Sequence, residues 1–117
     1  SDSERVENVE RMLRYIAEHA LDEISAEDVG RDAGLHPNYA MSVFKRAVGL
    51  TINQAIIRHR LDTAQSLLIA TDLSITDVSF ESGFGSVSRF YEAFSDRFNE
   101  KPTAFRKRMR SKGGAPT

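Results

Sequence analysis

The sequence predicts an all-α fold of seven helices, and three observations support this. Apolar residues recur at helical spacing along the chain, and no alternating stretch is long enough to suggest a strand. Residues that begin and end helices, such as Ser, Pro and Gly, interrupt the apolar pattern at regular places. A short capped helix followed by a glycine turn and a second helix also occurs twice.

Three helices are expected in the first 50 residues. Ser25 with Asp28 resembles a capping box, which begins a short helix that ends before Gly34. Pro37 stands at the first position of the next helix, which ends at Gly49. Before these, an apolar stripe predicts a helix over roughly residues 3–20, formed by Val6, Val9, Leu13, Ile16, Ala17 and Ala20. The helix that follows Pro37 is expected to bury Ala40, Phe44, Ala47 and Val48.

Four helices are expected in the remainder. Thr51 can cap a long helix that reaches about Ala70. Ser74 with Asp77 caps a short helix that Gly83 ends, and another helix runs from Ser86 to Phe98. Pro102 begins the last helix, to about Met109. The long helix presents an apolar face of Ile52, Ile56, Leu61, Ala64, Leu67 and Leu68.

The chain contains an internal repeat. The segment from Ser25 to Val29 matches the segment from Ser74 to Val78 at an offset of 49 residues. Beyond the turn, Ala40 and Phe44 match Phe90 and Phe94 at an offset of 50, so the second turn is one residue longer. Each copy has the helix-turn-helix pattern. We therefore divide the chain into a first helix and first motif (1–51), a linker helix (52–70), and a second motif with the last helix (71–117).

Composition limits the classes of function. The chain of 117 residues has no cysteine, which excludes disulfides, Cys-ligated zinc and thiol catalysis. No apolar run approaches the roughly 20 residues that span a bilayer, and no signal peptide is visible, so we expect a cytoplasmic protein. Because the chain begins with Ser rather than Met, we expect it to be a piece of a longer protein.

The charge is unevenly distributed. Residues 1–32 hold ten acidic and four basic residues, whereas residues 33–117 hold seven acidic and twelve basic ones. An acidic first helix thus precedes a basic remainder, although the net charge is only −1. The bases between Arg106 and Lys112 fit either a solvated end of the chain or a contact with phosphate.

Several motifs give the chain a family resemblance. The stretch from Arg60 through Leu61, Ala64, Leu67 and Leu68 is followed by the capped Ser74–Val78 segment, Gly83-Phe84, Phe90, Phe94, Pro102 and Phe105-Arg106. In order and spacing this resembles the DNA-binding domain of AraC/XylS-family transcription regulators, over residues 6–109. The stretches NYAMSVF and SRFYEAF give a narrower resemblance to the melibiose-operon regulator branch.

The resemblance implies a fold and a function. The fold is two helix-turn-helix subdomains bridged by one long helix, which sets two recognition helices about one DNA turn apart. The implied function is sequence-specific binding of double-stranded promoter DNA, usually with transcription activation through RNA polymerase. No cofactor or membrane contact is expected, and an effector would act only through an N-terminal domain that this chain lacks.

In the second motif, Phe94 and the neighbouring aromatics form the buried back of a helix whose front is polar. The N-terminal part of a recognition helix reaches bases, which selects Ser88, Arg89 and Glu92, with Ser86 as the N-cap. The family pattern adds Val87, in the turn that enters the helix. Arg89 can contact guanine, and Val87 a thymine methyl group. Glu92 can accept a hydrogen bond from cytosine or can pair with Arg89; the family usually has Arg or Lys there.

In the first motif, the family's base-contacting positions fall on Asn38, Met41 and Ser42. Asn38 can pair with adenine, whereas Met41 fits the edge of the core as well as a base. Lys45 and Arg46 lie a turn further along and suit phosphates. The candidate DNA-binding residues are therefore Asn38, Tyr39, Met41, Ser42, Lys45, Arg46, Ser86, Val87, Ser88, Arg89 and Glu92.

Two other classes of function compete. An enzyme finds little support, because His19, His36 and His59 have no carboxylate at metal-binding spacing, and no phosphate-binding glycine loop occurs. A helical module that binds proteins is the second alternative, which the acidic first helix favours. Salt-dependent DNA binding would distinguish it from a DNA-binding domain.

Overall fold

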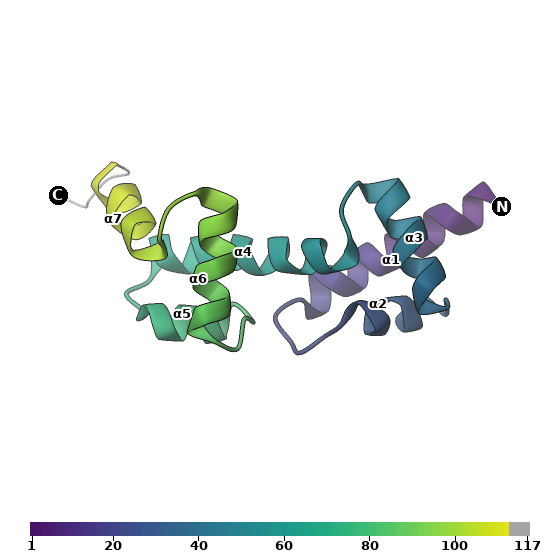
Figure 1. Cartoon of the computed structure of the whole chain (residues 1–117), viewed down its shortest axis with the longest axis horizontal. Helices are drawn as coiled ribbons and strands as arrows, with labels where there is room; N and C mark the ends of the chain where they lie inside the picture. Colours follow the sequence, from purple (N-terminus) through teal and green to yellow (C-terminus); the bar gives the residue numbers. More distant parts are fainter. Residues whose placement is uncertain (113–117) are drawn as a thin grey trace. The chain divides into compact units, whose positions relative to one another are not determined.

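The computed structural model describes residues 1–112, and all seven expected helices are confirmed within that range (Figure 1). They are α1 (Asp2–His19), α2 (Ala26–Asp32), α3 (Pro37–Val48), α4 (Ile52–Ala70), α5 (Ile75–Glu81), α6 (Val87–Phe98) and α7 (Pro102–Lys112). α7 continues three residues past the predicted end at Met109. The last five residues of the predicted 71–117 segment lie outside the described residues.

The chain forms two compact units, and the division between them falls inside α4, between His59 and Arg60. Each unit has its own apolar core. In the first unit α1, α2 and α3 pack against one another and against Ile52, Ala55 and Ile56 of α4. In the second unit Leu61, Ala64 and Leu68 of α4 join α5, α6 and α7. A single helix therefore contributes its apolar residues to both cores.

The predicted caps hold the starts of the helices. Ser25 and Asp28 form a complete capping box: the Ser25 hydroxyl accepts from the Asp28 amide at 3.2 Å, and the Asp28 carboxylate accepts from the Ser25 amide at 2.9 Å. The backbone and hydroxyl of Ser25 lower the pKa of the Asp28 carboxyl. Thr51 and Gln54 make the equivalent exchange at the start of α4, and Ser74 accepts from the Asp77 amide.

The two motifs differ in the length of the turn and in how closely their two helices approach. α2 and α5 have seven residues each and α3 and α6 twelve, but the second turn is one residue longer, as predicted. Gly34 supplies a positive φ of 74° in the first turn. In the first motif the helices approach closely, because a Cβ on Gly30 would lie 2.8 Å from the Cβ of Ala40. In the second, buried Ser79 and Phe90 occupy these repeat positions.

Two predicted apolar faces need correction. Val6 is 55% exposed, Leu13 39%, and Ala17 is also exposed, whereas Met12 is fully buried. The buried line of α1 instead consists of Val9, Met12, Ile16 and Ala20. The apolar arc of α1 is wider than its contact with α2 and α3, so its edge stays in solvent. In α3, Ala47 is exposed, whereas Val43, one turn earlier on the same side of the helix, is buried.

Aromatic rings form the core of the second unit. Phe90 and Phe94 are fully buried, and their ring centroids are 5.7 Å apart. Phe94 also contacts Phe105 of α7 at 5.3 Å and the half-buried Phe98 at 4.7 Å. These tilted and edge-to-face arrangements are the favoured geometry of aromatic pairs. Phe94 therefore joins α6 to α7, together with Phe98, whose ring lies 6.2 Å from that of Phe105.

Arg106, at the edge of this core, joins α7 to the end of α4 and to the turn that follows it. Its guanidinium donates to the carbonyl oxygens of Leu68 at 2.9 Å, Leu73 at 2.7 Å and Thr71 at 3.1 Å. The last carbonyls of a helix have no partner within the helix, so this one side chain caps α4 and fixes the turn that follows. Burial and the nearby Arg110 lower the pKa of Arg106, while Asp72 opposes them.

We expect Phe94→Ala to lower the free energy of unfolding of the second unit by about 3–5 kcal/mol, because it leaves a cavity among three aromatic neighbours. Urea unfolding followed by circular dichroism measures the change. Phe80→Ala is the matched control, since Phe80 is 57% exposed and its loss should cost little. Equal stabilities of the two variants would contradict the central place of Phe94.

We expect Arg106→Gln to destabilise the same unit by about 2–4 kcal/mol, because carbonyl groups at the end of α4 lose charged donors. Arg106→Lys should not restore stability, since one ammonium group cannot span three carbonyls with the geometry of a guanidinium. The melting temperatures of both variants are compared with that of Lys112→Gln, a control that removes one charge from the same helix. A lysine variant as stable as the parent would show that charge alone, without the fork of donors, is sufficient.

Candidate nucleic-acid interface

The first candidate surface is the exposed side of α3. Ala40, Val43 and Phe44 anchor the opposite side in the core. The His36 ring accepts a hydrogen bond from the Asn38 amide at 3.2 Å and caps the helix, which leaves the Asn38 side chain exposed at its N-terminal end. The structure also places four further candidates in solvent, namely Tyr39, Ser42, Lys45 and Arg46.

Two residues of this surface have additional contacts. Met41 is half-buried and packs against the first core, which is the structural alternative that its sequence position left open. The Lys45 ammonium donates to the carbonyl of Gly49 at 3.3 Å and so caps the C-terminus of α3. Lys45 is therefore partly engaged within the chain, whereas the side chains of Asn38 and Ser42 have no hydrogen-bond partner among residues 1–112.

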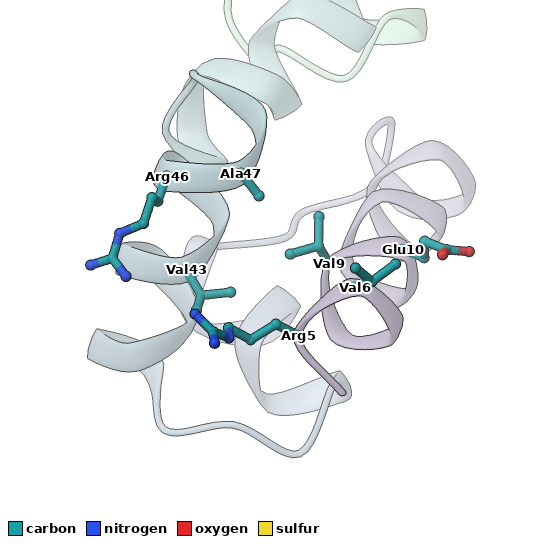
Figure 2. A pocket seen from close by; sticks show the side chains of 7 residues that line it. All are labelled: Arg5, Val6, Val9, Glu10, Val43, Arg46 and Ala47. Carbon is teal, nitrogen blue, oxygen red and sulfur yellow. The ribbon is translucent and has the colours of Figure 1, made fainter. Parts of the chain in front are cut away.

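A groove separates α3 from α1 beside this surface (Figure 2). It has a volume of about 270 Å³, and Val6 and Val9 of α1 face Val43 and Ala47 of α3 across it. The guanidinium of Arg46 points away from α1 in Figure 2. The groove also explains why Ala47 and Val6 remain exposed although both lie on apolar faces.

The second candidate surface lies at the start of α6. The Ser86 hydroxyl accepts from the Arg89 amide at 3.0 Å, which confirms Ser86 as the N-cap. The family pattern places Val87 in the turn, but in the structure Val87 is the first residue of the helix. Ser88, Arg89 and Glu92 are exposed, whereas Phe90 and Phe94 point into the core. The structure thus brings all five candidates to one helix end.

The charges on this surface are mixed. Within the described residues, no ion pair joins the Arg89 guanidinium to the Glu92 carboxylate, so the pairing considered from the sequence is not formed. Arg60 of α4 is half-buried close to Arg89, and burial together with the positive charge of Arg89 lowers the pKa of Arg60. The tip of α6 is therefore positive, and the carboxylates of Glu92 and Asp96 follow further along the helix.

Sequence reasoning did not include Arg60 among the site residues. In the sequence it belongs to a family motif and stands directly before the buried Leu61. Its electrostatic interaction with Arg89 arises between α4 and α6, and helical spacing within either segment carries no signal for it. A charged residue at the edge of an apolar helix face was the one available indication.

The basic residues of α7 mostly serve the fold. Arg106 binds backbone carbonyls, and Arg108 forms an ion pair with Glu100 at 2.7 Å. Arg110 pairs with Asp72 at 3.0 Å and also donates to the carbonyl of Thr71. Among the described residues, no cluster of three or more His, Asp or Glu side chains could hold a metal ion. Within residues 1–112, no helix has both the length and the apolar character that crossing a membrane requires.

Comparisons with known proteins agree with this architecture. The family profile of a helix-turn-helix domain matches residues 29–108, more than half of the chain and both motifs. The chain belongs to the helix-turn-helix family of AraC/XylS-type DNA-binding domains. The domain is 38% identical over 99 residues to the melibiose operon regulatory protein of Escherichia coli K12. The matched stretch covers 85% of this chain and 33% of that protein.

A second curated relative and a solved structure extend the comparison. The xylose operon regulatory protein of Escherichia coli K12 is 34% identical over 94 residues, 80% of this chain and 24% of that protein. The DNA-binding domain of AdpA, solved in complex with a target DNA, superposes with a TM-score of 0.86 at 22% identity and covers 92% of this chain and 97% of that one. The chain spans about a third or less of the length of the two curated relatives.

Proposed function

We propose that this chain binds double-stranded promoter DNA sequence-specifically, as the DNA-binding part of a larger bacterial transcription regulator in the cytoplasm. The observation that supports it most is the repeated arrangement of α3 and α6. Each has a core-anchored back, a capped N-terminus and an exposed polar front. A recognition helix needs these features to place its first residues against base edges in the major groove.

We assign separate roles to the exposed side chains. The amide of Asn38 pairs with an adenine, and the guanidinium of Arg89 with a guanine. Ser42, Ser88 and Tyr39 add hydroxyl contacts, and Val87 packs on a thymine methyl group. Lys45 and Arg46 bind phosphates, which position the protein without selecting a sequence. The solved complex of AdpA with its target DNA supports a DNA partner for this fold.

The remaining partners of the parent protein follow from the length of its relatives. The two curated relatives described above are longer regulators, of which the matched stretch makes up 33% and 24%. We infer that an effector acts on the parent through a domain outside this chain. We also propose that an exposed face contacts RNA polymerase. Because the family is one of DNA-binding domains, we assign the chain no catalytic role.

The direct test is a titration of the chain with promoter duplexes at several salt concentrations. Phosphate contacts release counterions, so a chain that neutralises several phosphates should lose affinity steeply between about 50 and 200 mM salt. A module that binds only proteins would show no such slope. Absence of salt-dependent binding to any duplex would overturn the proposal.

We expect Asn38→Ala to cost about 1–3 kcal/mol on the cognate site and to relax the preference at one base position. The physical reason is the loss of a paired amide donor and acceptor at a base edge. Binding to duplexes that vary one position at a time measures both effects. Asn53→Ala, an exposed asparagine of α4, should leave base preference unchanged. Unaltered preference in the Asn38 variant would contradict its role.

We expect Glu92→Arg to tighten binding to scrambled duplex and to steepen the salt slope by about one unit, because an exposed carboxylate repels phosphates and a guanidinium binds one. Glu7→Arg makes the same change of charge on exposed α1 and should alter the slope less. Glu92→Ala distinguishes repulsion of phosphates from the alternative role of Glu92, which is to bind a base. If Glu92 instead accepts from a cytosine, the alanine variant should lose about 1–3 kcal/mol on the cognate site alone.

A further inference from the structure

The start of α5 and one side of α7 enclose a shallow hollow in the second unit. It has a volume of about 500 Å³, and we call it the α7 hollow. It is lined by Ile75, Thr103, Arg106, Lys107, Arg110 and Ser111. Three of these six residues are cations and two carry hydroxyl groups. None of them belongs to the candidate DNA-binding residues on α3 and α6.

Most of the positive charge around the α7 hollow is not neutralised. α7 carries five basic residues and no acidic one. Asp72, paired with Arg110 at 3.0 Å, is the carboxylate next to the lining cations. The carbonyls that Arg106 binds satisfy its hydrogen bonds but carry no full negative charge. Burial is the main cause of the lowered pKa of Arg106; repulsion by Arg110 lowers it further, and Asp72 opposes both.

Lys107 differs from its basic neighbours. Arg106, Arg108 and Arg110 have partners within the chain, whereas Lys107 is exposed and is bound to no other described residue. Its ammonium group is therefore available to a ligand at the edge of the hollow. The hydroxyl of Thr103 provides a donor beside it, whereas the Ser111 hydroxyl donates to the carbonyl of Arg108 at 3.3 Å. Ammonium, guanidinium and hydroxyl donors around one hollow are the set that a phosphate group uses.

The position of the hollow indicates where that phosphate comes from. Ile75 is the first residue of α5, and α5 is the first helix of the second helix-turn-helix motif. In this motif the first helix crosses the DNA backbone while the second lies in the groove. The backbone should therefore pass close to α5, whose Ile75 lines the hollow, when α6 is docked.

We propose that the α7 hollow binds one DNA backbone phosphate, with Lys107 as its principal contact and Arg110 and Thr103 as further donors. This inference rests on the proposed function. It makes α7 both a structural helix, through Arg106, and an anchor on DNA. It also supplies the second motif with a phosphate contact beside a recognition helix that carries the acids Glu92 and Asp96.

The test compares Lys107→Gln with Lys101→Gln, which removes the same charge from an exposed lysine outside the hollow. Dissociation constants are measured on a cognate and a scrambled duplex at several salt concentrations. We expect Lys107→Gln to reduce the salt slope by about one unit on both duplexes, with the melting temperature unchanged. Lys101→Gln should retain the parent slope.

Phosphate ethylation interference locates the contact. One phosphate whose ethylation weakens binding of the parent should cease to matter for Lys107→Gln and should still matter for Lys101→Gln. A steep parent slope that both variants share, with identical interference patterns, would overturn the α7 hollow as a DNA contact and leave the proposed function standing. A parent without any salt slope would overturn both. Stabilisation by inorganic phosphate that depends on Lys107, with no change in DNA binding, would assign the hollow to a free anion and contradict the proposal.

Discussion

The second unit depends on the hydrogen bonds from the Arg106 guanidinium to three backbone carbonyls. By capping α4 and fixing the turn after it, Arg106 holds α7 in place. Phe105, its neighbour in the chain, then lies against Phe94, and Phe94 with Phe90 forms the back of α6. A partly buried cation thus fixes α7, the helix whose Phe105 packs against the back of α6. A unit of fewer than 60 residues has a small core, so one such cap is a large part of its stability.

The two motifs share a plan but differ in chemistry. In the first, the close approach at Gly30 and Ala40 lets α2 and α3 pack with small residues, and the front of α3 offers amide, hydroxyl and cationic groups. In the second, Phe90 fills the corresponding space and the front of α6 mixes Arg89 with carboxylates. Carboxylates near phosphates oppose binding, so we attribute most of the base selectivity to the first motif. In this proposal the second motif contributes chiefly through Arg89 and through its proposed contacts with DNA phosphates.

Local signals in the sequence predicted the helices well. Capping serines, Pro37 and the glycines act within a few residues of where they stand, and each helix begins or ends at the expected place within a few residues. Tertiary facts were harder to predict. The apolar arc of α1 is wider than its contact, so periodicity could not tell Leu13 from Met12. The basic run of α7 suggested solvent or phosphate, but Arg106 binds carbonyls more than 30 residues away in the chain.

The candidate site was predictable to the extent that it follows from helical geometry. Phe44 and Phe94 point inward, which fixes the opposite faces of α3 and α6 as exposed. The proximity of Arg60 to Arg89 and the hollow beside α7 depend on contacts between helices, which spacing along one helix does not encode. The roles of individual residues toward bases remain predictions.

Selection of bound duplexes from a random pool, followed by sequencing, tests the central claim most directly. With the chain as bait, we predict a reproducible enriched site in which the most strongly selected positions lose their selection when Asn38 is replaced and keep it when Glu92 is replaced. A pool that stays random after several rounds would contradict sequence-specific binding. An enriched site whose strongest positions depend on α6 alone would contradict the assignment of selectivity to the first motif.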